Sequence, residues 1–461
     1  MVRFLSAHFS VRTIFLGFSE VCLIALAFIG ATFARVGMTN AGWILSQDGG
    51  YAKIVIVLLI FIVCMYYFDL YDSAVLSNLG EMLSRWIQVL GTVCILLSLL
   101  YYLFPPLGLG RGIFVIGFCF GAVAPLLSRR LFLFVNGLPQ FVERAVILGD
   151  GSVAESLIME LQGHPELGIR VVGHLKSSES ANDIQNLNCR EKRITELMTS
   201  VRSYKPNRVV VAFGEKRGNL PVEALLQLKD GGLKIEEGVD LYEAITGKVY
   251  IGTLRLSDLL FSHTGSAVMI SKRALSIILS VIGLALFFPL MLLITIAIRL
   301  DSAGPLIFRQ KRVGKDGKLF TLYKFRTMVD RADEGDNHRP AEIADWRITR
   351  VGRLLRRAHL DELPQLINIL QGDMTFVGPR PFVPSQERDY VQQIPYYSRR
   401  WAVRPGATGW AQVNRGYNST IDDNRDKLAY DLFYIRNCSV GLDLLILFKT
   451  LKILILGRGG R

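Results

Sequence analysis

The chain has 461 residues, of which 51% are hydrophobic, and a formal net charge of +13. This apolar content excludes an ordinary soluble enzyme and favours a membrane protein with soluble parts. The positive charge fits cytoplasmic loops and contact with anionic headgroups. A nucleic-acid-binding protein would instead need a basic face with aromatic platforms and no membrane spans, so we expect membrane lipids and no nucleic acid as partners.

Four apolar segments open the chain and predict a four-helix transmembrane region over residues 1–140. They cover residues 14–34, 54–68, 86–104 and 113–127. Cationic residues cluster before the first segment and after the fourth, which predicts that both ends lie on the cytoplasmic side. These cations are Arg3, Arg12, Arg129, Arg130 and Arg144.

Glu20 lies inside the first apolar segment, where a carboxylate is costly. It could mark a functional site. A neutral or helix-paired structural carboxyl is the interpretation we favour.

Residues 141–265 alternate strand-like and helical patterns, which predicts a parallel sheet in a Rossmann-like (CoA/NAD-binding-like) domain. Residues 143–149 are typical of a buried strand, and 150–162 of a turn and helix. Further strand-like runs cover 170–175 and 208–213.

The turn after the first of these strands fits G-x-G-x-x-A, from Gly149 to Ala154. Such a turn can present backbone N–H groups to a pyrophosphate. However, Lys176, Ser177 and Ser178 stand where a ribose-binding acid would be expected. We therefore favour a domain that binds no dinucleotide.

A second long apolar run, residues 274–298, is flanked by Lys272-Arg273 and by Arg299, with Pro289 in its middle. An interior proline kinks or breaks a helix. A kinked fifth span would place the rest of the chain outside the cell. The cations at both ends and the basic region that follows favour a re-entrant helix instead, one that enters a single leaflet and returns.

Residues 306–328 predict a hairpin around Asp316-Gly317. Its cations are too numerous for a merely solvated hairpin and could bind phosphates or lipid headgroups. They are Arg309, Lys311, Arg312, Lys324 and Arg326.

Asp361 and Glu362 follow Arg356 and Arg357 and precede Pro364. Proline is tolerated in the first turn of a helix, so it places the carboxylates at a helix entrance, where anions are favoured. The pair could be an ordinary N-terminal charge arrangement. It could also hold a metal and supply a nucleophile for phosphoryl chemistry.

Two further segments combine arginine with proline: Gly378-Pro379-Arg380-Pro381 and Arg404-Pro405-Gly406. Stiff backbone lowers the entropic cost of holding a cation toward a phosphate. Either segment could also be an ordinary turn. Residues 442–456 predict a terminal apolar helix dotted with lysine.

Taken together and in this order, these motifs resemble the bacterial sugar transferase family, the polyprenyl-phosphate hexose-1-phosphate transferases. The resemblance covers residues 266–461. The motifs that carry it are Lys272-Arg273, the apolar helix broken at Pro289, Lys324-Phe325-Arg326-Thr327-Met328, Asp361-Glu362-Leu363-Pro364-Gln365, Gly378-Pro379-Arg380-Pro381 and Arg404-Pro405-Gly406. The four spans and Rossmann-like domain upstream resemble the long members of the family, and also the exosortase (PEP-CTERM) exopolysaccharide priming type.

The resemblance implies a monotopic, mainly α-helical catalytic domain on the cytoplasmic face of a bacterial inner membrane. It implies a UDP-sugar donor, UDP-glucose as a first guess, an undecaprenyl phosphate acceptor and Mg²⁺. By the same analogy Asp361 forms a covalent aspartyl-phosphosugar intermediate with release of UMP, as the priming step of exopolysaccharide biosynthesis. Whether the protein is a homodimer stays open.

The expected site residues fall into two groups. Asp361 and Glu362 are expected to be catalytic and to hold the metal. Substrate binding is expected from Lys272, Arg273, Arg312, Lys324, Arg326, Arg356, Arg380 and Arg404.

Two other classes of function compete with this one. The first is a non-enzymatic membrane scaffold or ligand sensor of polysaccharide assembly. The second is an NAD-dependent enzyme that modifies sugar nucleotides. That enzyme normally needs a Tyr-x-x-x-Lys pair after its Rossmann strands, and residues 150–265 contain none.

Overall fold

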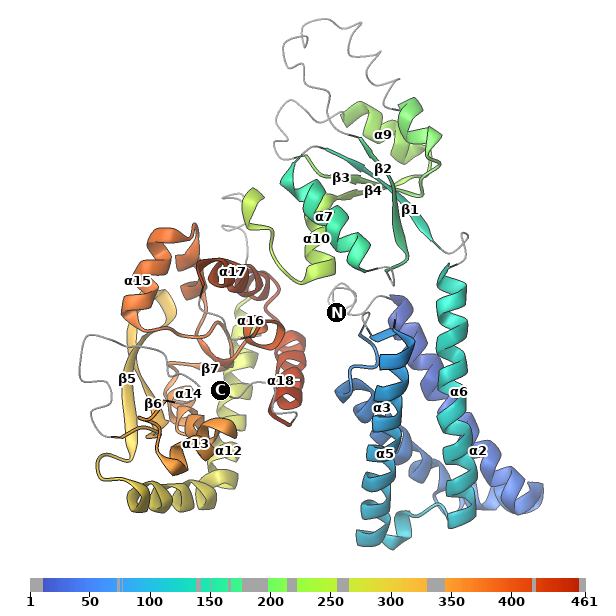
Figure 1. Cartoon of the computed structure of the whole chain (residues 1–461), viewed down its shortest axis with the longest axis horizontal. Coiled ribbons are helices and arrows are strands. Elements are labelled where there is room, and N and C mark those ends of the chain that lie inside the picture. The colour runs from blue at the N-terminus through green and yellow to red at the C-terminus, as the bar shows by residue number, and fades with distance from the viewer. Residues whose placement is uncertain are drawn as a thin grey trace, which may run out of the picture. The chain divides into compact units, whose positions relative to one another are not determined.

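The computed structural model describes residues 11–72, 75–76, 78–137, 142–149, 151–164, 167–175, 198–213, 222–254, 265–329, 345–416 and 420–455. These residues form two compact units, 2–246 and 247–461, each described by itself (Figure 1). Arg3, Asp150 and the predicted ribose-acid position at 176–178 lie outside the described residues.

Four long helices open the first unit: α2 (Val11–Ser46), α3 (Gly50–Tyr67), α5 (Leu79–Leu103) and α6 (Arg111–Gly137), with the short η1 (Pro105–Leu107) before the last. Each is long and apolar enough to cross a membrane, as is one helix of the second unit. Helix α2 packs against both α3 and α6. Large apolar side chains such as Phe28, Phe61 and Trp86 fill the space between the helices. The predicted apolar helices at the N-terminus are confirmed.

Glu20 forms a buried ion pair with Arg129 across α2 and α6. The two side chains are joined by two hydrogen bonds, Nε to Oε1 at 2.5 Å and Nη2 to Oε2 at 3.0 Å, and both are fully buried. Tyr71 donates its hydroxyl to Glu20 Oε2 at 2.9 Å, and Arg129 donates to the Leu70 carbonyl at 3.2 Å. The helix-paired carboxyl that we favoured for Glu20 is therefore confirmed.

A four-stranded parallel sheet follows, in the order β2-β1-β3-β4. Its strands are β1 (Glu143–Leu148), β2 (Ile169–Leu175), β3 (Arg208–Val211) and β4 (Lys234–Glu237), and its helices are α7 (Ser152–Gly163), α9 (Val222–Asp230) and α10 (Gly238–Thr246). The central strands are apolar and buried, as strands covered on both faces must be. The predicted parallel pairing is confirmed, whereas β4 was not foreseen because its sequence, Lys-Ile-Glu-Glu, is mostly charged.

Gly149, the first glycine of the G-x-G-x-x-A turn, has a structural reason of its own. Its φ is 134°, and a Cβ there would lie 2.4 Å from the Ala212 carbonyl oxygen. Only glycine lets the end of β1 approach the end of β3 so closely. The motif therefore does not require a bound nucleotide to explain it.

The second unit combines short helices with two small sheets. Strands β5 (Ile307–Val313) and β6 (Leu319–Phe325) form the predicted hairpin, and β7 (Thr375–Val377) pairs in parallel with β8 (Gly406–Thr408). The helical elements are η4 (Ile251–Thr253), α12 (Ser266–Asp301), η5 (Lys315–Gly317), α13 (Arg350–Arg357), η6 (Leu360–Glu362), α14 (Gln365–Gln371), α15 (Pro384–Gln393), η7 (Tyr397–Ala402), α16 (Trp410–Asn414), α17 (Ile421–Arg436) and α18 (Val440–Ile455). Helix α18 confirms the predicted terminal helix.

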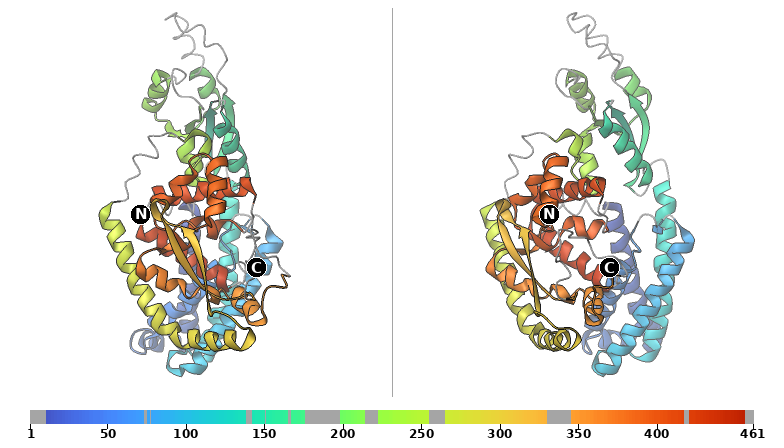
Figure 2. Two further views of the ribbon diagram at one scale, coloured as in Figure 1. Left: turned by 90° about the vertical axis from the view of Figure 1, so that its left-hand side faces the viewer. Right: turned by 60° about the vertical axis from the view of Figure 1, so that its left-hand side comes forward.

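Helix α12 changes direction along its length and keeps both of its halves on this unit (Figure 2). It contains Pro289, which removes a backbone hydrogen bond. Before the proline, Gly283 lies against Leu366 of α14. After it, Ile294 and Ile298 pack in one apolar cluster with Phe325 of β6 and with α13. Large apolar side chains between these contacts are exposed.

The buried Glu20–Arg129 pair gives a stability prediction. Glu20→Gln leaves a buried arginine without its counter-charge, so we expect a loss of about 3–5 kcal/mol in the free energy of unfolding. Glu81→Gln removes a half-exposed i,i+4 partner of Arg85 in the same bundle, worth about 0.3–0.5 kcal/mol. We expect thermal unfolding in detergent to show a clearly lower unfolding temperature for Glu20→Gln than for Glu81→Gln. Equal unfolding temperatures would show that Glu20 does not hold the bundle together.

Candidate active site

The two adjacent carboxylates lie in a short turn of their own. Helix α13 ends at Arg357, His359 takes a left-handed backbone conformation (φ 55°), and η6 carries Asp361 and Glu362 before Pro364 opens α14. Positive φ is unusual for a residue other than glycine and is characteristic of constrained sites. The sequence placed the pair at the entrance of a helix. The reversal at His359 instead gives it a separate turn immediately before that helix.

Glu362 is held ionised by two cations. Lys324 of β6 donates to Glu362 Oε1 at 2.6 Å, and Arg380 donates to the same oxygen at 3.4 Å. Burial alone would raise the pKa of Glu362, but the charges of Lys324 and Arg380 outweigh it and hold the pKa at about 2. A carboxylate with so low a pKa is suited to holding cations in place and unsuited to exchanging protons near neutral pH.

Asp361 differs from its neighbour in every respect that matters for reactivity. Its side chain is buried, and its Oδ2 lies 3.8 Å from Lys324 Nζ, beyond hydrogen-bond distance. Among the described residues no side-chain hydrogen bond to its carboxylate is formed. Burial is the main reason that its pKa is raised; Lys324 opposes this shift and Glu362 adds to it. Glu362 is therefore hydrogen-bonded to two cations and strongly acidic, whereas Asp361 has only a longer ion pair with Lys324 and is more basic.

Two further predicted cations, Arg356 and Arg312, lie near the pair. Arg356 lowers the pKa of Asp361 through its charge and donates to Thr327 Oγ1 at 2.8 Å. Arg312 of β5 donates to the Pro381 carbonyl at 3.1 Å, and burial followed by repulsion from Arg380 lowers its pKa to about 10. The cations from β5, β6, α13 and the 378–381 segment thus converge on one turn, as phosphate binding would require.

Arg326 faces elsewhere. It donates to the carbonyl and the hydroxyl of Ser302, at 2.6 and 2.8 Å, and so ties the end of α12 to the end of β6. Its Nε and Nη1 are buried and have no hydrogen-bond partner in the described part of the chain. Its predicted role in substrate binding stays a prediction.

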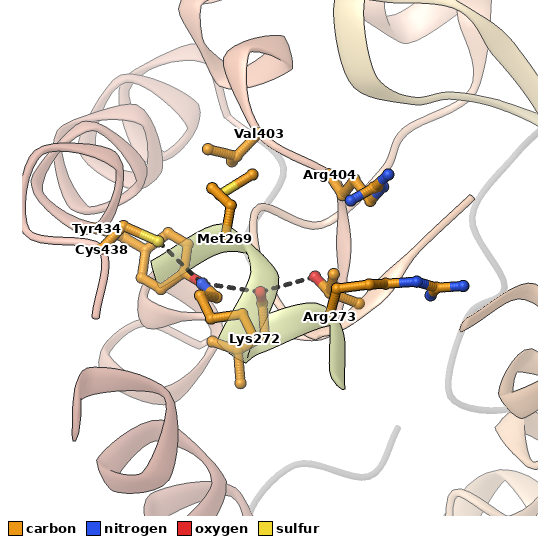
Figure 3. Close-up of a pocket in the computed structure, with 9 residues that line it drawn as sticks. Met269, Lys272, Arg273, Val403, Arg404, Tyr434 and Cys438 are labelled. Carbon is orange, nitrogen blue, oxygen red and sulfur yellow. Dashed lines mark hydrogen bonds between the residues drawn. The ribbon is translucent and has the colours of Figure 1, made fainter. Parts of the chain in front are cut away.

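The remaining predicted cations line a separate small pocket of about 20 Å³, room for about one water molecule. Figure 3 shows Lys272 pointing to Tyr434 and Cys438, while Arg273 points away from them. Lys272 is hydrogen-bonded to Tyr434, lies 2.9 Å from Cys438 Sγ, and pairs with Asp443 of α18 at 3.0 Å. These contacts tie α12 to α17 and α18.

Arg273 holds the C-terminal end of α14, the helix that begins at Gln365. It donates to the carbonyls of Ile369 and Leu370 in the last turn of that helix. Arg404 lines the same pocket as Lys272. Within the described residues no hydrogen bond or ion pair joins Lys272, Arg273 or Arg404 to Asp361 or Glu362. Their predicted contacts with substrate stay predictions.

Sequence reasoning missed a buried network centred on Arg400. Its guanidinium binds Asp431 at 2.7 Å and Tyr397 at 2.6 Å, and donates to the Arg380 carbonyl at 3.0 Å. It therefore fixes the backbone that presents the Arg380 side chain to Glu362. The signal that could have revealed it is Asp431 itself, a lone acid inside the apolar run of α17.

The sequence matches a known protein family and several characterised relatives. Residues 267–457 match the bacterial sugar transferase family. A UDP-N-acetylgalactosamine-undecaprenyl-phosphate N-acetylgalactosaminephosphotransferase of Aeromonas hydrophila is 42% identical over 48% of this chain and 52% of its own length. A UDP-glucose:undecaprenyl-phosphate glucose-1-phosphate transferase of Caulobacter vibrioides is 45% identical, over 41% and 71%. One of the same description from Xanthomonas campestris pv. campestris is 32% identical, over 72% and 71%.

The last of these matches covers 72% of this chain and 71% of the relative, so it reaches well upstream of the Asp361-Glu362 turn. With five helices long and apolar enough to cross a membrane, the protein is a membrane protein. The residues that match, the carboxylate turn that they contain and the relatives' shared length together show that the chain belongs to the bacterial sugar transferase family.

Proposed function

We propose that the protein transfers a sugar 1-phosphate from a UDP-sugar to undecaprenyl phosphate, with release of UMP, as the priming step of exopolysaccharide synthesis. The observation that carries the proposal is the pair Asp361 and Glu362. Glu362 is hydrogen-bonded by Lys324 and Arg380, and Asp361 has only a 3.8 Å ion pair with Lys324. UDP-glucose is the first candidate donor, since two of the relatives compared above are named for it. The relative named for N-acetylgalactosamine makes the sugar a matter for experiment.

The proposed chemistry has two displacements at one phosphorus atom. A carboxylate oxygen of Asp361 attacks the phosphorus that carries the sugar, a new P–O bond forms, and UMP leaves with the electron pair of the broken anhydride bond. A phosphate oxygen of undecaprenyl phosphate then attacks the same phosphorus, and the Asp361 carboxylate leaves with its electron pair restored. The covalent stage lets a water-soluble donor and a membrane-bound acceptor use one site in turn.

The cations of the site answer the main demand of phosphoryl transfer, which is to offset charge on the oxygens around phosphorus. Arg356 and Lys324 lie beside Asp361, and Arg380 and Arg312 lie on the side of Glu362. Lys324 serves both carboxylates, so its charge also favours the ionised form of the attacking group.

Magnesium fits this site only in the manner usual for that ion, through one or two carboxylates with water and substrate phosphates as the other ligands. The described residues contain no cluster of three or more acidic, histidine or cysteine ligands. Asp361 and Glu362 are the two carboxylates that would hold it. Bound there, magnesium would neutralise phosphate charge.

We propose a place in the bacterial inner membrane, with the catalytic unit on the cytoplasmic face and α12 as a re-entrant helix. The support is that both halves of α12, before and after Pro289, pack on the same unit. A helix that crossed the whole bilayer would carry its second half away from that unit. Lys272 and Arg299 near its ends suit a return to one headgroup layer.

The parallel sheet of residues 143–237 is proposed to be a Rossmann-like domain without a nucleotide. Gly149 is explained by its close approach to Ala212. A scaffold or a sensor function is the alternative from another class, and release of UMP from a panel of UDP-sugars separates it from a transferase.

Asp361→Asn tests the nucleophile. The amide keeps the shape but cannot attack, so we expect turnover to fall by about a thousandfold or more, with binding of the UDP-sugar less affected. Wild type incubated with labelled UDP-sugar and no lipid acceptor should release UMP and carry label on the peptide that contains Asp361.

The matched control is Asp422→Asn, the same change at an exposed position of the same unit, which should leave turnover unchanged. Near-normal turnover of Asp361→Asn, or label on another residue, would overturn the assignment and favour direct transfer between the substrates.

The raised pKa of Asp361 predicts an acidic limb in the pH profile of kcat. Activity requires the ionised form, so it should fall as pH drops through a midpoint above 3.8, the ordinary value for aspartate. Lys324→Gln removes a charge that favours ionisation and should move the midpoint to higher pH. A midpoint that stays in place or falls in this variant would show that the limb does not report Asp361.

Topology is tested by reporter fusions or cysteine labelling at Asp150 and after Arg461. Both positions should report cytoplasm if α12 re-enters, since four spans precede it. A periplasmic C-terminus would instead make α12 a fifth span.

A further inference from the structure

The four-helix bundle has a cavity of about 440 Å³ whose lining includes none of the site residues described above. It lies where the C-terminal part of α2 meets the beginnings of α3 and α6, within the first unit. A cavity of this size can hold a small polar ligand. Its lining residues include Arg35, Asp48, Lys53 and Arg111.

The charges of the cavity do not balance. Lys53 is paired with Asp48, Nζ to Oδ2 at 2.7 Å. Arg35 and Arg111 form no hydrogen bond or ion pair with any part of the chain that the structure describes. Two guanidinium groups therefore share one cavity without a counter-charge, which favours a bound anion.

Arg35 and Arg111 line the same cavity although they lie on different helices. The Arg35 side chain lies against the start of α6, where a Cβ at Gly112 would come 2.6 Å from its Nε. The cavity also faces the first turns of α3 and α6, whose leading N–H groups lack partners within their helices. The positive ends of two helix dipoles thus add to the two arginines.

The distance along α6 places the cavity at headgroup depth. Arg111 and Arg130 lie near opposite ends of this helix, 19 residues apart by their numbers, or about 28 Å at 1.5 Å per residue. The hydrocarbon core of a bilayer is about 30 Å thick, so each arginine lies at one of the two headgroup layers. Lipid phosphates are the anions present in quantity at that depth.

We propose that this cavity binds the phosphate of an anionic glycerophospholipid, held by Arg35 and Arg111. Zwitterionic lipids fit less well because their cationic group would meet the same arginines. The site is independent of the sugar transfer; only the identity of its leaflet follows from the proposed topology.

The test uses the full chain in an uncharged detergent, titrated with short-chain phosphatidylglycerol, with unfolding temperature and native mass spectrometry as readouts. Wild type should show saturable stabilisation and retain one lipid. The Arg35→Gln/Arg111→Gln variant should need an at least about tenfold higher lipid concentration. Arg130 is an exposed arginine near the opposite end of α6. The Arg130→Gln variant should change the required lipid concentration by less than about twofold.

Two further arms identify the ligand. Short-chain phosphatidylcholine should give no saturable effect, and inorganic phosphate should not replace the lipid. Equal binding by the double variant, equal binding of phosphatidylcholine, or saturation by inorganic phosphate alone would each overturn the proposal. Should the double variant misfold, Arg111→Gln alone removes an exposed side chain and must still weaken lipid binding.

Discussion

The ion pair between Lys324 and Glu362 is the contact on which the catalytic unit depends. It joins strand β6 of the hairpin to the η6 turn, two segments far apart in the chain, and leaves the neighbouring Asp361 with only a longer ion pair to Lys324 and no side-chain hydrogen bond among the described residues. Glu362 forms ion pairs with both Lys324 and Arg380, and their charges lower its pKa. Asp361 is buried without a side-chain hydrogen bond among the described residues, so its pKa is raised. Two identical functional groups side by side thus acquire different chemistry from their surroundings.

Several structural contacts serve only to hold this arrangement. Arg400 fixes the backbone of Arg380 by donating to its carbonyl, and it forms ion pairs with Asp431 and Glu387. Arg273 closes the far end of α14, whose near end follows Glu362. A catalytic turn built from a positive-φ residue and a short helix has little intrinsic stability, so it depends on such buried charges for its position.

Arginines of the four-helix bundle show a different balance of charge. Arg129 is matched by Glu20 and is fully buried within the bundle. Arg35 and Arg111 are exposed in a cavity and lack such partners among the described residues. The first arrangement stabilises helix packing, because neither charge can be left alone in hydrocarbon. The unpaired charges of Arg35 and Arg111 can instead attract an anionic ligand.

The sequence alone determined the membrane helices, the parallel pairing of the early strands, the hairpin and the family to which the chain belongs. These follow from runs of apolar residues, strand periodicity and short motifs, all of which are local along the chain. Only the tertiary structure decided that Lys324 and Arg380 meet Glu362, that Lys272 pairs with Asp443, and that Arg400 supports the site. Those partners are separated by between 18 and 171 residues, and a cation carries no mark in the sequence of the anion it will meet. Burial raises the pKa of both carboxylates, and the charges of Lys324 and Arg380 lower that of Glu362 alone. Both effects depend on how the chain packs.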